Sequence, residues 1–155
     1  MNQDHTFLLV EDNQDDLDLT LRAFASNKFT SRIDVARDGQ AALDYLFATG
    51  AYAGRDPSSQ PVVVLLDLKL PKIGGLEVLR RMRLDERTRR IPVVVLTSSE
   101  EQKDIIASYD FGANSFVRKP VNFLEFTEAA RQLGVYWLAL NRPPLVSPAE
   151  TVVPD

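Results

Sequence analysis

The chain has 155 residues, of which 45% are hydrophobic and 26% charged, and its formal net charge is −4. These values predict one globular domain with a short appendage, and the absence of a basic stripe argues against direct nucleic-acid binding. No cysteine is present, which excludes disulfides, thiol catalysis and cysteine-based metal sites. The polar N-terminus lacks a signal-peptide pattern and no apolar run could span a bilayer, so we expect a cytoplasmic protein without membrane contact.

The first predicted strand ends at two carboxylates. The apolar residues 7–10 run directly into Glu11 and Asp12. A helix is expected next, with Asp15 and Asp16 at its positive end, where the helix dipole favours acids. Its apolar residues recur at helical spacing and are Leu17, Leu21 and Phe24.

A long loop separates the second and third predicted strands. Residues 33–36 alternate as a short strand, and a helix containing Leu43, Leu46 and Phe47 follows. Residues 50–61 hold two glycines, two prolines and two serines, which predicts a loop longer than the usual connection. The unbroken apolar run 62–66 then predicts a strand covered on both faces, and Asp67 comes directly after it.

The third predicted helix runs from about Gly75 to Leu84, with an apolar stripe of Leu76, Leu79 and Met82. Residues 93–96 predict the next strand, which delivers Thr97. Residues 98–102 have the pattern of a helix start, with a serine cap followed by acids. That helix is expected to end at residues 112–114, where a glycine occurs.

The last predicted strand, residues 115–118, leads into Lys119. A final helix is expected from Asn122 to about Asn141, with one apolar face formed by Phe123, Phe126, Ala130, Leu133 and Trp137. Residues 143–155 contain four prolines and no helical or strand period, which indicates an extended tail. The predicted organisation is therefore one domain over residues 1–142 and a proline-rich tail over residues 143–155.

Strict alternation of five strands and five helices predicts an α/β fold, a doubly wound parallel sheet with helices on both faces. Right-handed crossovers favour the flavodoxin-like strand order 2-1-3-4-5. This order places the first and third strands side by side. It should therefore bring Asp12 and Asp67 together at the switch point of the sheet, where such folds bind their ligands.

Three carboxylates, those of Glu11, Asp12 and Asp67, would repel one another unless a cation were present. Oxygen ligands without histidine or cysteine favour Mg²⁺. We expect Asp12 and Asp67 to bind the ion directly and Glu11 to act through water. A main-chain carbonyl near Lys69 could supply a further oxygen.

The same strand ends could support phosphoryl transfer. An aspartate such as Asp67 can attack a phosphoryl group and form an acyl phosphate. Lys119 could then neutralise phosphoryl oxygens, and the Thr97 hydroxyl could donate a hydrogen bond to them. The alternative is a structural ion pair between Asp67 and Lys119. Reactive groups at four strand ends favour the functional interpretation.

These residues resemble a known family. The motifs that carry the resemblance are Glu11-Asp12, residues 67–71 with Gly74-Gly75, Thr97-Ser98 and residues 116–120. Together they are similar to the receiver domain of two-component response regulators, over roughly residues 7–140. The resemblance implies a switch protein, not an enzyme beyond its own phosphorylation and dephosphorylation.

The resemblance implies that Asp67 accepts phosphate from a histidine kinase and that Glu11 and Asp12 hold Mg²⁺. Thr97 and Lys119 would bind the phosphoryl group, and Phe116 falls at the position of the switch aromatic. The bond between Lys119 and Pro120 would be a cis peptide. Phe116 has no hydroxyl, so its inward and outward states should differ through packing alone.

Looser features narrow the resemblance. The long loop 50–61 and residues 136–138 with the prolines 143–144 are similar to small stand-alone regulators partnered with bacterial phytochromes. This implies a bacteriophytochrome-type sensor kinase as phosphodonor. The downstream protein partner is unknown from sequence.

An aromatic and apolar surplus on the last helix could mark an interface. Tyr136, Trp137 and Leu140 broaden its apolar arc, and for Trp137 core and interface are both open. We expect a homodimer built on the fourth helix, the fifth strand and the fifth helix, with Tyr136, Trp137 and the proline-rich tail contributing. This same surface is expected to signal to the partner.

Two other functional classes fit less well. An aspartyl-phosphate phosphohydrolase resembles Asp-x-Asp-x-Thr at its nucleophile, but here Lys69 and Pro71 occupy the second and fourth positions after Asp67. A flavodoxin-like cofactor binder needs a hydroxyl- and glycine-rich phosphate loop after the first strand. Residues 11–13 are Glu-Asp-Asn instead, and the two acids would repel a phosphate.

Overall fold

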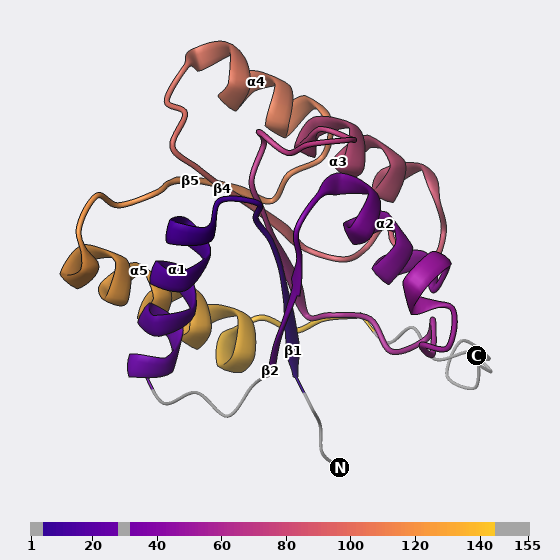
Figure 1. Ribbon diagram of the computed structural model, residues 1–155, viewed down its shortest axis with the longest axis horizontal. Coiled ribbons are helices and arrows are strands. Elements are labelled where there is room, and N and C mark those ends of the chain that lie inside the picture. The colour runs from indigo at the N-terminus through magenta and orange to yellow at the C-terminus, as the bar shows by residue number, and fades with distance from the viewer. Residues whose placement is uncertain (1–4, 28–31, 145–155) are drawn as a thin grey trace.

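The computed structural model describes residues 5–27 and 32–144. In this part of the chain a parallel sheet has the order β2-β1-β3-β4-β5, which confirms the predicted fold (Figure 1). The strands are β1 Thr6–Val10, β2 Arg32–Ala36, β3 Val63–Leu66, β4 Val93–Thr97 and β5 Ser115–Arg118. No helix in these ranges is long and apolar enough to cross a membrane.

Helices cover both faces of the sheet (Figure 1). The α-helices are α1 Gln14–Ser26, α2 Gly39–Phe47, α3 Gly75–Leu84, α4 Gln102–Asp110 and α5 Phe123–Val135. A 3₁₀ turn, η1, spans Gly50–Tyr52, and a π-helical turn, η2 Tyr136–Leu140, extends α5. α1 and α5 pack on one face, α2 and α3 pack on the other, and α4 lies beside β5.

Alternate residues of the central strands supply two separate core layers. In β1, Leu8 and Val10 pack with α2 and α3, while Phe7 and Leu9 pack with α1 and α5. The residues of β3 divide between the layers in the same way and are fully buried. This two-sided burial is why the sequence of β3 shows an unbroken apolar run instead of alternation.

Side chains cap three of the helices. Asn13 accepts a hydrogen bond from the Asp16 amide at 2.9 Å, and the N-cap residues Asp38 and Asn122 accept in the same way before α2 and α5. For α4 the predicted serine cap is wrong. The Ser99 hydroxyl instead donates to Asp104 Oδ2 at 2.6 Å, and the helix begins later, at Gln102, without a side-chain cap.

Two predicted apolar stripes are shifted. In α3 the buried positions are Gly75, Val78, Leu79 and Met82, whereas Leu76 is half-buried. The stripe starts at Gly75 because that glycine lies against the β3–α3 connection. In α5 the first predicted core residue, Phe123, is 38% exposed, and its ring lies under the Arg22 guanidinium at 5.5 Å.

Two side chains of the long loop after α2 hold it against that helix. Arg55 donates to the Tyr45 carbonyl at 2.6 Å, and its guanidinium lies 4.0 Å from the centre of the Tyr45 ring. Gln60 donates to the Leu46 carbonyl at 2.9 Å. The loop therefore takes a fixed course despite its length, and it contains the 3₁₀ turn η1.

The C-terminal end of the described chain lies at the edge where β3 and β4 begin. Pro143 and Pro144 line a small hollow there together with Pro61 and Pro92. The rest of the predicted tail, residues 145–155, lies outside the described residues.

Candidate functional site

The sheet itself brings two of the acids together. Val10 and Leu66 are register partners at the ends of β1 and β3, so the next residues, Glu11 and Asp67, emerge side by side. The Asp67 amide donates to the Val10 carbonyl at 3.2 Å, which extends the pairing past the end of the strand. Glu11 and Asp67 are 2% and 8% exposed, whereas Asp12 is exposed.

Glu11, Asp12 and Asp67 form an acidic cluster. One carboxylate oxygen from each residue lies within 4.8 Å of the others. This spacing allows one cation to contact all three, and oxygen ligands of this kind suit a hard divalent ion. The predicted meeting of Asp12 and Asp67 is therefore present in the structure.

Lys119 lies at the centre of the site. Its Nζ donates to Glu11 Oε1 at 2.6 Å and to Asp67 Oδ2 at 3.0 Å, and its side chain is 6% exposed. The Lys119 amide donates to the Thr97 carbonyl at 2.7 Å, which fixes the lysine to the end of β4. The structure therefore contains the ion pair between Lys119 and Asp67, and this pair belongs to a larger network.

Asp16 joins this network and was not predicted as a site residue. Its Oδ2 accepts from Lys119 Nζ at 2.8 Å. From the sequence we expected Asp16 only to interact with the helix dipole. Asp16 lies in the first turn of a helix that begins at the same sheet edge, where side chains point toward the strand ends. This position could have marked it as a site residue in the sequence.

The positive charge of Lys119 does not fully offset the cost of burying the negatively charged acids. Burial raises the pKa of Glu11 to about 7, although its hydrogen bond and ion pair with Lys119 act in the opposite direction. Burial also opposes the charge of Lys119, but hydrogen bonds to Asp16 and Glu11 and the charge of Asp67 outweigh it, so the pKa of Lys119 lies above its ordinary value. The donor set thus suits a further cation.

Thr97 is 1% exposed and sits at the end of β4, and its hydroxyl accepts from the Ser99 amide at 3.3 Å. Lys69 is exposed, and its amide donates to Asp67 Oδ1 at 3.4 Å. A metal contact from its carbonyl stays a prediction.

The expected cis bond between Lys119 and Pro120 is wrong, because this peptide is trans.

Phe116 and Trp137 lie on opposite faces of the sheet. Phe116 is half-buried and packs with the core layer of α2 and α3. Trp137 is 8% exposed and packs with the layer of α1 and α5, so core packing accounts for it. Tyr136 and Leu140 are 47% and 65% exposed and remain available for contacts.

A glycine lets the β3–α3 connection turn closely past Asp67. A Cβ on Gly75 would overlap the Asp67 carbonyl oxygen and would lie 2.7 Å from the Leu68 Cα. The neighbouring Gly74 has room, since its Cβ would lie 3.9 Å from the nearest atom, the Leu68 carbonyl oxygen. Gly75 is therefore the glycine of this motif that the site needs.

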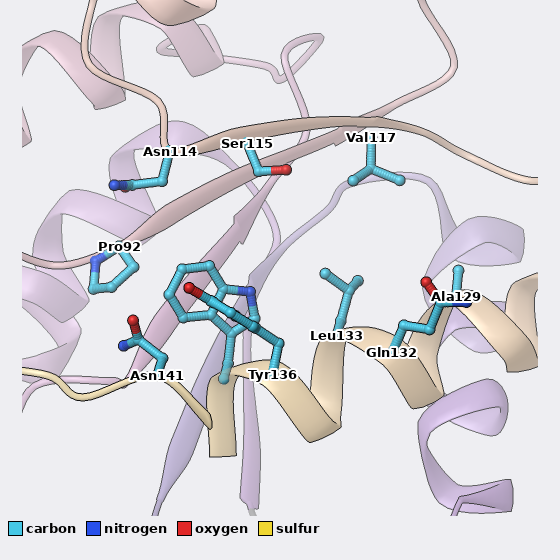
Figure 2. Close-up of a pocket in the computed structure, with 10 residues that line it drawn as sticks. Pro92, Asn114, Ser115, Val117, Ala129, Gln132, Leu133, Tyr136 and Asn141 are labelled. Carbon is cyan, nitrogen blue, oxygen red and sulfur yellow. The ribbon is translucent and has the colours of Figure 1, made fainter. Parts of the chain in front are cut away.

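A separate hollow of about 570 Å³ lies between β5 and α5 (Figure 2). Leu133 and Tyr136 border it on the helix side, and Ser115 and Val117 border it on the strand side. None of its lining residues belongs to the acidic cluster or is Lys119. The acidic cluster and Lys119 are thus at the strand ends and not in this hollow.

Comparison with known proteins agrees with this geometry. The sequence matches the family profile of the response regulator receiver domain over residues 7–131. The chain belongs to this family. The receiver is 46% identical over 137 residues to the probable methanogenesis regulatory protein FilR2 of Methanothrix harundinacea, covering 88% of this chain and 86% of that one.

Solved receivers also resemble this one. The phosphorylated cyanobacterial phytochrome response regulator RcpA has a TM-score of 0.84 and 36% identity, over 92% of this chain and 99% of that chain. The Mn²⁺-bound form of the response regulator Rcp1 has a TM-score of 0.81 and 34% identity, over 90% and 99%. The bacteriophytochrome response regulator AtBRR is 51% identical, with a TM-score of 0.74 over 91% and 100%. The receiver is thus related to phytochrome response regulators.

Proposed function

We propose that this receiver is a cytoplasmic switch protein in which Asp67 accepts a phosphoryl group from the phosphohistidine of a histidine kinase. The observation that carries the proposal is Lys119 Nζ, which lies 3.0 Å from Asp67 Oδ2 and 2.6 Å from Glu11 Oε1 at the open end of the sheet. A nucleophile, a cation and an acidic cluster meet there. Phosphoryl transfer needs this combination of groups.

In the transfer, an Asp67 carboxylate oxygen attacks phosphorus and a P–O bond forms. The P–N bond of the phosphohistidine breaks, and its electron pair stays on the imidazole nitrogen. Lys119 donates hydrogen bonds to the phosphoryl oxygens and offsets their charge. Thr97, at the end of β4, donates its hydroxyl to another phosphoryl oxygen when the group is in place. Hydrolysis of the acyl phosphate by water returns the carboxylate.

Mg²⁺ is the ion that we propose for the acidic cluster. Asp12 and Asp67 would hold it directly, with Glu11 acting through water and the Lys69 carbonyl as a further ligand. When bound, the ion would offset the negative charge of the phosphoryl oxygens. Two observations support this: the oxygen-only donor set within 4.8 Å, and the pKa of Glu11, which burial raises to about 7 with Lys119 as its partner.

The phosphodonor that we propose is a bacteriophytochrome-type sensor kinase. The 51% identity to the bacteriophytochrome response regulator AtBRR supports this choice. Phosphotransfer from a panel of phosphorylated histidine kinases would test it. We expect transfer from a bacteriophytochrome-type kinase to be fastest, and faster transfer from another class would overturn the pairing.

The output surface that we propose is formed by α4, β5 and α5, and it also forms a homodimer. Exposed apolar side chains on it support this. On α4 and just after it, Ile106, Tyr109 and Phe111 are 52%, 51% and 39% exposed, and Tyr136 and Leu140 add to them beyond α5. Phe116 is on β5 and packs with the core layer of α2 and α3, and we propose that it couples this surface to Thr97.

Phosphorylation by a small donor tests whether Asp67 is the phosphoacceptor. Incubation of the wild type with acetyl phosphate and Mg²⁺ should add one acid-labile phosphate, measured by intact-protein mass spectrometry. Asp67→Asn keeps the shape of the side chain but removes the nucleophile, so it should add none. Asp38→Asn, at the N-cap of α2, is a control that should be modified as the wild type is. Normal modification of Asp67→Asn would overturn the assignment.

A further inference from the structure

All three hydrogens of the Lys119 ammonium are engaged. Glu11 and Asp67 accept two of them, and Asp16 on α1 accepts the third at 2.8 Å. The three acids differ in exposure: the side chains of Glu11 and Asp67 are 2% and 10% exposed, whereas that of Asp16 is 38% exposed. Water can replace the lysine at Asp16 more easily than at the other two.

The backbone of Asp16 is held on both sides of its side chain. Its amide donates to the capping residue Asn13 at 2.9 Å, and its carbonyl accepts from the Thr20 hydroxyl at 2.7 Å. Lys119 is fixed in turn by the hydrogen bond that its backbone amide donates to the Thr97 carbonyl. The contact therefore joins the first turn of α1 to the end of β5 directly beside the phosphoacceptor.

Phosphorylation of Asp67 would put Asp16 in competition for the lysine. Because Lys119 has only three hydrogens, a donor given to a phosphoryl oxygen must be withdrawn from one of its present partners. Asp16 Oδ2 and Asp67 Oδ2 each lie within 3.0 Å of the same Nζ, so they are at most about 6 Å apart. A carboxylate at that distance also repels a phosphoryl group.

We propose that Asp16 is a positioning residue that holds Lys119 in the unphosphorylated state and opposes phosphorylation of Asp67. It acts through the lysine and through its own charge. This inference rests on the proposed function of Asp67. It adds a residue on α1 that sets how readily the switch is turned on.

The test compares Asp16→Asn with Asp15→Asn. Both variants lose one negative charge from the first turn of α1, but of these two acids the described structure pairs Asp16 alone with Lys119. The measurements are the initial rate of phosphorylation by acetyl phosphate and the affinity for beryllofluoride, an analogue of the phosphoryl group, both with saturating Mg²⁺. Removal of the opposing charge should raise both by about threefold or more in Asp16→Asn.

Asp15→Asn should stay within about 1.5-fold of the wild type, because screened surface charges have small effects. Asp16→Glu restores the charge and should return both values toward the wild type. Tighter beryllofluoride binding cannot arise from a merely structural loss. Equal behaviour of Asp16→Asn and Asp15→Asn, or slower phosphorylation of Asp16→Asn, would overturn the inference. If the wild type itself is not phosphorylated at Asp67, the proposed function fails instead.

Discussion

At the scale of single residues, the acids of the site differ in burial and in partners. Glu11 is 2% exposed and shares its oxygens between Lys119 Nζ and the Asn13 amide at 3.1 Å. Asp12 is exposed, and in the described chain it does not pair with Lys119. Asp12 thus keeps its carboxylate available, whereas metal binding at Glu11 must compete with existing hydrogen bonds.

This difference predicts unequal roles in metal binding. Asp12→Ala should weaken Mg²⁺ binding by about tenfold or more, because it removes the exposed carboxylate that we propose as a direct ligand. Glu11→Ala should weaken it less, since we propose that Glu11 acts through water. Isothermal titration calorimetry would measure both, with Asp15→Ala as the control for loss of one nearby charge. Normal affinity in the Asp12 variant would rule out the proposed ligand set.

At the scale of elements, the connection from β3 to α3 depends on one of two adjacent glycines. Gly75→Ala should destabilise the fold by about 2 kcal/mol or more, because its Cβ would press on the backbone of Asp67 and Leu68. The movement should also displace Asp67 and slow its phosphorylation. Gly74→Ala should cost less than about 1 kcal/mol, since its surroundings are open. Urea unfolding would compare the two, and equal losses would contradict the steric argument.

A second contact between elements links α2 to β2. The Tyr45 hydroxyl donates to Asp34 Oδ2 at 2.6 Å. The pKa of Asp34 lies below its ordinary value, mainly because Arg32 donates to it, and the Tyr45 hydrogen bond adds to this. Burial and the same bond raise the pKa of Tyr45 to about 12. The pair therefore favours the folded state while Asp34 is ionised.

Tyr45→Phe should lower the free energy of unfolding by about 1–2 kcal/mol at pH 7. Since folding lowers the pKa of Asp34, its contribution is present above the ordinary value of 3.8 and is lost as the pH falls through the folded value. The gap between variant and wild type should therefore narrow in acid. Thermal unfolding at pH 7 and pH 3 measures this, with Tyr52→Phe as the control. A gap that widens in acid would exclude the linkage.

At the scale of the whole molecule, the proposed dimer depends on side chains beyond α5. Tyr136 and Leu140 are exposed, whereas Trp137 belongs to the core, so Tyr136→Ala with Leu140→Ala tests the surface without opening the core. Sedimentation velocity should show a dimer for the wild type and a monomer for the double variant. Leu84→Ala, which alters a 72% exposed leucine on α3, should remain dimeric. A monomeric wild type, phosphorylated or not, would end the dimer hypothesis.

The sequence alone determined the fold and most of the site. Strands and helices have different apolar periods, and parallel strands place their carboxyl ends at one edge of the sheet. The order of elements was therefore enough to bring Glu11, Asp12, Asp67 and Lys119 together. Even the end of α3 and the extent of β5 follow from local patterns.

Only the tertiary structure decided how side chains share their partners. Asp16 and Ser99 both lie near helix starts, but Asp16 accepts from Lys119, 103 residues away, and Ser99 donates to Asp104 instead of capping α4. The face on which Trp137 packs was likewise settled by its neighbours in space. Periodicity is a property of one segment, whereas the choice among competing hydrogen-bond and packing partners depends on segments that are distant in the chain.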